Sequence, residues 1–298
     1  RAEMILCFVV ATLLRVKDAS LRDVEPLLNR VDDSFRRSVI AELDDDDLIR
    51  FWTQTIPAMA RDSHLPILNR IHKLLSPKVR AVLCRKGSLD VRRIMDERKI
   101  LLIAASDGIL GPRSAEIVAA FAAAQIQVAT MARANVPASA RPRFHLYLDE
   151  FPSIVGPDPR TYESLLVRAR KFNVALHLAS QHTSMLPDAV LHGILGNVGT
   201  LIAFSAGAED ARKLGREFAV NGSRIDTGLL RLGVGEAYCK FDRTVVHTRM
   251  LPPPEGGSVA VREEIIRRSR AKYGADAPVM TRRRPDISLD DLAAGDVF

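Results

Sequence analysis

An apolar segment in the middle of the chain ends in two acidic residues and reads Phe144-His145-Leu146-Tyr147-Leu148-Asp149-Glu150. Its first five residues are apolar or aromatic apart from one histidine, and such a short run predicts a buried β-strand. Two carboxylates, Asp149 and Glu150, follow at once. In phosphoryl-transfer sites an Asp in this position binds Mg²⁺, and a neighbouring residue orients the attacking water. An acidic pair that is merely solvated at the end of a strand is the alternative interpretation.

Strands and helices alternate around this stretch. The apolar run 100–105 predicts another buried strand, and a Gly-containing turn over 106–112 separates it from an Ala-rich helix over 113–134. Downstream we expect a helix over 159–172, strands over 174–179 and 200–204, a helix over 208–218, and a hairpin of 235–241 with 244–249. This order predicts an α/β fold, in which a parallel sheet is covered by helices on both faces and binds ligands at the carboxyl ends of its strands.

Residues 3–83 differ from the rest, because their apolar residues recur only at helical spacing. The acidic run Asp44–Asp47 suits the first turn of a helix. A metal cluster is the alternative, although successive helical residues point in different directions. Near the other end, the Pro- and Gly-rich segment 252–257 predicts a linker before a charged helix over 258–273. We therefore divide the chain into a helical domain (1–87), an α/β core (88–251) and a linker, helix and tail (252–298).

Composition limits the class of partner. The chain has 298 residues and a net charge of +7, with an isoelectric point of about 9.6, which favours polyanions such as nucleic acid or anionic lipid. The distant cysteines Cys7, Cys84 and Cys239 predict reduced, buried thiols and neither a disulfide nor a zinc site. The apolar run 4–14 is shorter than the roughly 18 to 20 residues of a membrane helix, so it predicts a core helix.

Two further features agree with a role for Asp149 and Glu150. Gln181 lies just after the strand 174–179, where a side-chain amide can contact a γ-phosphate or orient water. Arg168 and Arg170 end the preceding helix, and an arginine there can reach the nucleotide of a neighbouring subunit. Cations at a helix C-terminus also complement the helix dipole whatever the function, so that alternative stays open.

Together these residues resemble a known family. Segments 146–154 (LYLDEFPSI), 168–174 (RARKFNV) and 179–181 (ASQ) closely resemble the motor domain of conjugative coupling proteins of the TraD/TraG class, and the related HerA/FtsK-type DNA translocases. Segments 100–103 and 107–111, 66–70, 88–95 and 193–200 are similar as well, and the resemblance extends to the helix 267–273, so it covers most of the chain. It implies a RecA-like P-loop NTPase fold whose all-α inserted domain is the helical region, assembled as a homo-hexameric ring around DNA.

The resemblance also implies roles for single residues, with ATP and Mg²⁺ as cofactors. Asp149 would hold the metal, Glu150 would activate water, and Gln181 and Arg170 would act on the nucleotide, the arginine across a subunit boundary. We prefer Arg170 to Arg168 for that role because it lies nearer the end of the helix; Arg168 is assigned to nucleotide binding. Relaxase or secretion-channel proteins are expected partners, in the cytoplasm or on the cytoplasmic face of the inner membrane.

One departure from the family is large. A phosphate-binding loop requires the pattern G-x-x-x-x-G-K-S/T. The segment 108–114 has glycines but no Lys and contains Pro112, and 85–88 lacks the first glycine. We expect the loop, and any membrane anchor, upstream of these residues; a degenerate paralogue is the alternative.

The function expected from the sequence follows from that departure. The chain would be a fragment of an ATP-driven DNA translocase or coupling ATPase of conjugation or type IV secretion, inactive in isolation. A non-hydrolysing ring protein that recruits DNA or a secretion substrate is the alternative. The sequence does not distinguish conjugative from chromosomal or phage-related pumping.

Overall fold

The computed structural model describes residues 2–60, 62–84, 89–155, 166, 168–219 and 224–273. The chain divides into two units, Arg1–Gly256 and Gly257–Phe298. In the second unit the structure describes the charged helix expected there, α16 (Val259–Tyr273), none of whose residues is buried. The division into three domains drawn from the sequence stays a prediction.

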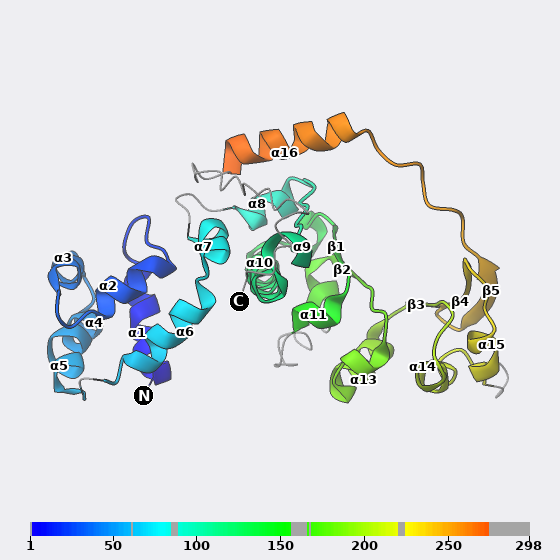
Figure 1. Cartoon of the computed structure of the whole chain (residues 1–298), viewed down its shortest axis with the longest axis horizontal. Coiled ribbons are helices and arrows are strands. Elements are labelled where there is room, and N and C mark those ends of the chain that lie inside the picture. Colours follow the sequence, from blue (N-terminus) through cyan, green and yellow to red (C-terminus); the bar gives the residue numbers. More distant parts are fainter. Residues whose placement is uncertain are drawn as a thin grey trace, which may run out of the picture. The chain divides into compact units, whose positions relative to one another are not determined.

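The described residues before position 85 form helices only, as their apolar spacing predicted (Figure 1). The Asp45 carboxylate caps one of them by accepting the N–H groups of Asp47 and Leu48, both at 3.1 Å, so a helix does start in the acidic run. That this region is an inserted domain stays a prediction. The elements are α1 (Ala2–Leu13), η1 (Leu21–Asp23), α2 (Val24–Leu28), α3 (Ser34–Ala41), α4 (Asp46–Arg50), a π-helical turn η2 (Phe51–Thr55), α5 (Ile56–Ala58), α6 (Leu65–Leu74) and α7 (Pro77–Leu83).

The apolar segment 144–148 forms a strand, as expected, and it pairs in parallel with the next strand. β1 (Phe144–Leu148) aligns residue for residue with β2 (Val174–Leu178), so the two strands end together. Side chains alternate between the two faces of a strand. On one face Leu146 and Leu148 are buried in a core that they share with helix α10 (Pro112–Ala132).

The other face of this strand pair carries an exposed aromatic stack. The rings of Tyr147 and His177 lie 4.1 Å apart between centroids, and His145 Nδ1 is 3.0 Å from His177 Nε2. Helix α11 (Phe151–Val155) follows β1. Of the helix expected over 159–172, most lies outside the described residues, and its last turn is η5 (Arg170–Phe172).

A separate antiparallel sheet corrects the prediction for the run 200–204. β3 (Thr200–Ala203) does not extend the parallel sheet; it pairs antiparallel with β4 (Glu236–Phe241), which forms the expected hairpin with β5 (Thr244–Arg249). Local apolar character predicts a strand but not its partner, and Ala203 packs in a core of this sheet instead. The remaining elements of this region are η6 (Thr183–Met185), α13 (Asp188–Asn197), α14 (Ala208–Leu214) and α15 (Asp226–Leu230).

The apolar run 100–105 is not a strand, which corrects a second prediction. It connects α8 (Val91–Asp96) to α9 (Asp107–Leu110), and Ile100 and Leu102 are 87% and 77% exposed. A strand needs partners for its backbone N–H and C=O groups, and no described residue pairs with this run. An apolar composition alone therefore does not make a strand here.

Helix α10 is the Ala-rich helix expected over 113–134. With the turn η3 (Arg133–Asn135) it forms a 24-residue segment that is long and apolar enough, by composition alone, to cross a membrane. Ile126 and Ala129 are buried in the core shared with β1, although only 28% of the apolar window of this segment is buried. The turn η4 (Ala138–Ala140) then leads into β1.

Candidate active site

Asp149 and Glu150 lie directly after β1, where the backbone bonding to the neighbouring strand continues for one more step. The N–H of Ala179 donates to the carbonyl of Leu148 at 3.0 Å, and the N–H of Phe151 donates to Ala179 at 3.1 Å. Between Leu148 and Phe151 the chain turns sharply, because Glu150 has φ +49°, which is uncommon for a residue other than glycine. The N–H of Glu150 donates to the Asp149 carboxylate at 3.1 Å. The backbone thus holds both acidic residues at the edge of the sheet.

Gln181 lies at the same edge. Leu148 and Leu178 are register partners, so Asp149 and Gln181 follow the ends of two neighbouring strands. Asp149 and Gln181 are exposed and Glu150 is half-buried. The structure therefore gathers the predicted metal ligand, the predicted base and the predicted amide at the carboxyl end of the strand pair.

Arg168 and Arg170 lie at the opposite edge. They come just before the first residue of β2, a strand that spans about 16 Å at roughly 3.3 Å per residue. Neither guanidinium therefore shares an edge with Asp149 and Gln181 of its own chain. Both arginines are exposed, which leaves them accessible to another molecule.

Asp210 is a site residue that the sequence analysis missed. This buried carboxylate on α14 accepts the backbone N–H of Thr183 at 3.1 Å and the Thr183 hydroxyl, and it lies 3.5 Å from His182 Nδ1. It thereby fixes the chain just after Gln181. The only local signal was an acid in the first turn of a helix, which suits the helix dipole and says nothing of a partner 27 residues away.

The donors at this edge fit a hydrated magnesium ion. Mg²⁺ binds through one or two carboxylates, keeps several waters and shares its remaining positions with phosphates. Asp149 presents such a carboxylate, and Glu150 stands beside it. Within the part of the chain that the structure describes, no three His, Cys, Asp or Glu side chains gather as a caged transition metal would require.

Comparison with known proteins bears on the fold. The sequence matches no family model and no curated protein. Among solved structures, the chain is similar to the bacterial conjugative coupling protein TrwB in its unbound monoclinic form, with a TM-score of 0.50 and 12% identity over 84% of this chain and 68% of that one. It is also similar to TrwB in complex with the non-hydrolysable GTP analogue GDPNP, with a TM-score of 0.49 and 12% identity over 84% and 69%. A further similar structure is VirB4 of Thermoanaerobacter pseudethanolicus, with a TM-score of 0.39 and 16% identity over 80% and 75%.

The first of these likenesses defines the fold. The chain has the fold of a conjugative coupling protein, as the segments around Asp149, Arg170 and Gln181 predicted; that residues 3–83 are an all-α domain inserted into this fold stays a prediction. At 12% identity the likeness extends to the fold alone. A fold of this kind does not by itself specify a function, which depends on the residues of the site.

Proposed function

We propose that the chain carries the hydrolytic half of the nucleotide site of an ATP-driven DNA translocase, a coupling ATPase of conjugation or type IV secretion. The observation that carries this proposal is the meeting of Asp149, Glu150 and Gln181 at the carboxyl end of β1 and β2. That end is where parallel α/β sheets bind their ligands. The fold shared with TrwB, a conjugative coupling protein, supports the choice of class.

Each residue at this edge has a distinct task in phosphoryl transfer. Asp149 holds Mg²⁺, which when bound neutralises charge on the phosphates. Glu150, half-buried beside it, polarises the attacking water. The amide of Gln181 contacts the γ-phosphate or orients that water. The phosphate-binding loop comes from outside these 298 residues, because no such pattern occurs within them.

The arginines act on a different nucleotide. Because Arg168 and Arg170 lie at the far end of β2, they serve the site of a neighbouring subunit in a homo-hexameric ring. Arg170 stabilises the charge on the transferring phosphoryl group, and Arg168 contributes to nucleotide binding. The function therefore requires an assembly of several copies.

The partners follow from charge and class. A net charge of +7 suits a protein that surrounds DNA. Relaxase or secretion-channel proteins are the further partners proposed, and the helical region before residue 85 is the inserted domain. The location is the cytoplasm or the cytoplasmic face of the inner membrane, where a segment outside these residues would supply any anchor.

The missing phosphate loop favours a second candidate function. A member of the class without that loop would be a non-hydrolysing ring protein that recruits DNA or a secretion substrate. In such a protein Arg168 and Arg170 would still be exposed, but Glu150 would have no water to activate for hydrolysis. The two candidates differ in one measurable property, which is turnover.

The test is ATP hydrolysis by the full-length protein, with and without DNA, against Glu150→Gln. We expect the variant to lose about a hundredfold or more in kcat, the range over which a positioned base acts. The matched control is Glu116→Gln, an exposed glutamate on α10, which should keep the wild-type rate. Equal rates in wild type and Glu150→Gln would refute the proposed mechanism. Robust turnover by residues 1–298 alone would refute the proposal that the phosphate-binding loop lies outside them.

A further inference from the structure

The turn that carries Arg170 has its backbone acceptors filled. Four successive carbonyl groups accept hydrogen bonds: Arg170 from the Asn173 N–H (3.1 Å), Lys171 from Arg141 Nη1 (2.7 Å), Phe172 from Arg133 Nη1 (3.2 Å) and Asn173 from the Phe144 N–H (3.0 Å). Carbonyls at the end of a helix are often left to water. Here two of the donors are guanidinium groups 30 and 39 residues away in the chain.

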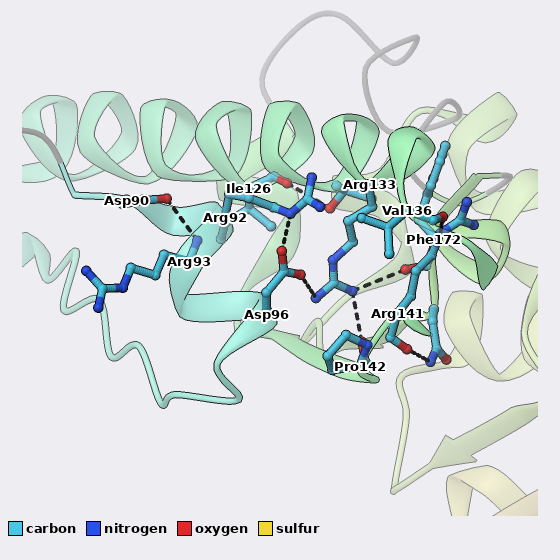
Figure 2. A network of polar contacts seen from close by, with 12 residues as sticks. Asp90, Arg92, Arg93, Asp96, Ile126, Arg133, Val136, Arg141, Pro142 and Phe172 are labelled. Carbon is cyan, nitrogen blue, oxygen red and sulfur yellow. Dashed lines mark hydrogen bonds and ion pairs between the residues drawn. The ribbon is translucent and has the colours of Figure 1, made fainter. Parts of the chain in front are cut away.

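Arg133 is the more deeply buried of these two donors, with no exposed surface. Its Nη1 also donates to the carbonyl of Pro142 at 3.0 Å, and its Nη2 lies 3.2 Å from the carboxylate of Asp96 on α8 (Figure 2). Burial lowers the pKa of the Arg133 guanidinium, and the Asp96 charge opposes that change. Arg92 bonds the other oxygen of Asp96. A buried cation that donates to the carbonyls of two segments and pairs with the carboxylate of a third holds these segments together, since moving any of them would leave a buried donor or the charge without its partner.

Arg141 supports the same turn from the loop before β1. Besides the bond to Lys171, its Nε donates to the carbonyl of Val136 at 2.8 Å, and its guanidinium carbon lies 5.4 Å from the centroid of the Phe172 ring. Asn173, at φ +58°, completes the arrangement by donating its side-chain amide to the Arg141 carbonyl at 2.8 Å. The loop and the turn are therefore bonded in both directions.

The side chains of the turn divide into two kinds. Ala169 and Phe172 are buried at 2% and 6% exposure, whereas Arg168 and Arg170 point to solvent. The backbone is thus anchored while the two cationic side chains stay accessible. A cation that stabilises a transition state in another subunit works best when its position is fixed beforehand.

We propose that Arg133 and Arg141 are positioning residues that hold the Arg170–Asn173 turn, so that Arg170 reaches the nucleotide of the neighbouring subunit. The inference rests on the proposed function, because it presumes that Arg170 acts in trans. It adds two residues that touch no nucleotide and that act only through the backbone of the turn.

The first experiment measures the turn itself. Arg141→Lys and Arg133→Lys keep the charge but lose the planar fork that bonds two acceptors at once. We expect faster amide hydrogen exchange over residues 168–176 of the full-length protein in both variants. The control is Arg30→Lys, whose guanidinium donates to the carbonyls of Ile56 and Met59 in the helical region and should leave that exchange unchanged. Unchanged exchange over 168–176 in Arg141→Lys, the less buried site, would overturn the proposal even if Arg133→Lys fails to fold.

The second experiment separates positioning from general stability. We expect kcat to fall by about ten- to a hundredfold, with little change in the KM for ATP. Rings that mix Arg141→Lys or Arg133→Lys with Glu150→Gln subunits should regain activity, as rings of Arg170→Ala with Glu150→Gln should, because each partner supplies what the other lacks. Recovery with Arg170→Ala but not with the two positioning variants would overturn this inference alone. No recovery with Arg170→Ala would refute the trans role in the proposed function, and the exchange measurement would then decide whether the two arginines hold the turn.

Discussion

The Asp210 carboxylate accepts the backbone N–H of Thr183 at 3.1 Å, and this bond links helix α14 to the turn η6 that follows β2. Thr183 lies two residues after Gln181, at the edge of the parallel strand pair. Asp210 lies on α14, beside the antiparallel sheet, and is only 8% exposed. A movement of α14 would therefore displace the segment that contains Gln181 and Thr183.

Asp210→Ala should lower both stability and turnover. The variant leaves the Thr183 N–H without its acceptor, which costs about 1–3 kcal/mol in the free energy of unfolding. We expect kcat to fall with little change in the KM for ATP, because only the position of Gln181 is disturbed. Urea unfolding and ATPase kinetics check the two effects. The neighbouring Glu209→Ala, which removes only an exposed ion pair with Lys213, should cost less than about 0.5 kcal/mol; a similar loss in both variants would contradict the role of Asp210.

Thr12→Val should destabilise the helical region. The Thr12 hydroxyl accepts the indole N–H of Trp52 at 2.8 Å in a buried site, so valine leaves that donor unsatisfied at a cost of about 1–3 kcal/mol. Trp52 is the only tryptophan of the chain, so its fluorescence reports unfolding of this region directly. Thr53→Val removes an exposed hydroxyl bonded to its own helix and should change the midpoint little.

Stability at acid pH should depend on Glu97. Hydrogen bonds from Lys99 and Arg93 lower the pKa of its carboxyl from 4.5 to about 2. A lowered folded-state pKa stabilises the protein above about 4.5, and this contribution is lost as the pH falls toward about 2. An NMR titration of the Glu97 carboxyl measures the midpoint. Because the group is exposed, salt should raise that pKa toward 4.5, and Glu97→Gln should remove its share of the pH dependence.

Gly215→Ala should disrupt the region around α14. A methyl group at this position would lie 1.9 Å from Asp226 Oδ1 and 2.7 Å from the backbone oxygen of Ala211, so the backbone must shift, at a cost of about 1–3 kcal/mol. In contrast, a methyl group at Gly193 in α13 meets no atom within 4 Å, and alanine there should be neutral or stabilising by up to about 1 kcal/mol. Thermal unfolding of the two variants should give shifts of opposite sign or clearly different size.

Several elements could be predicted from the sequence because they depend on near neighbours. The helices before residue 85 follow from apolar residues three and four apart, and the capping of α4 by Asp45 follows from an acid beside free N–H groups. The hairpin of β4 and β5 needs only a short turn, with Asp242 at φ +57°. The placement of Asp149 and Gln181 at one edge follows from two parallel strands.

The predictions that were wrong concern strand pairing, which depends on segments that are distant in the chain. The run 100–105 has the composition of a strand, but strand formation requires a bonded neighbour, and no described segment provides one. β3 was correctly placed along the sequence, yet its antiparallel partner β4 lies more than thirty residues downstream. Composition carries no information on such pairings.

Short segments of the sequence predicted the coupling-protein fold, the strand 144–148, its two carboxylates and Gln181, but not the sheet partners of the runs 100–105 and 200–204. Long-range packing places Arg170 at the opposite edge from Asp149, and it brings Arg133, Arg141 and Asp210 to the segments that they hold. A hydrogen bond of a charged side chain needs its partner at a defined distance and angle. For these three side chains the partners lie 27 to 39 residues away, and packing brings them together, which no local pattern describes.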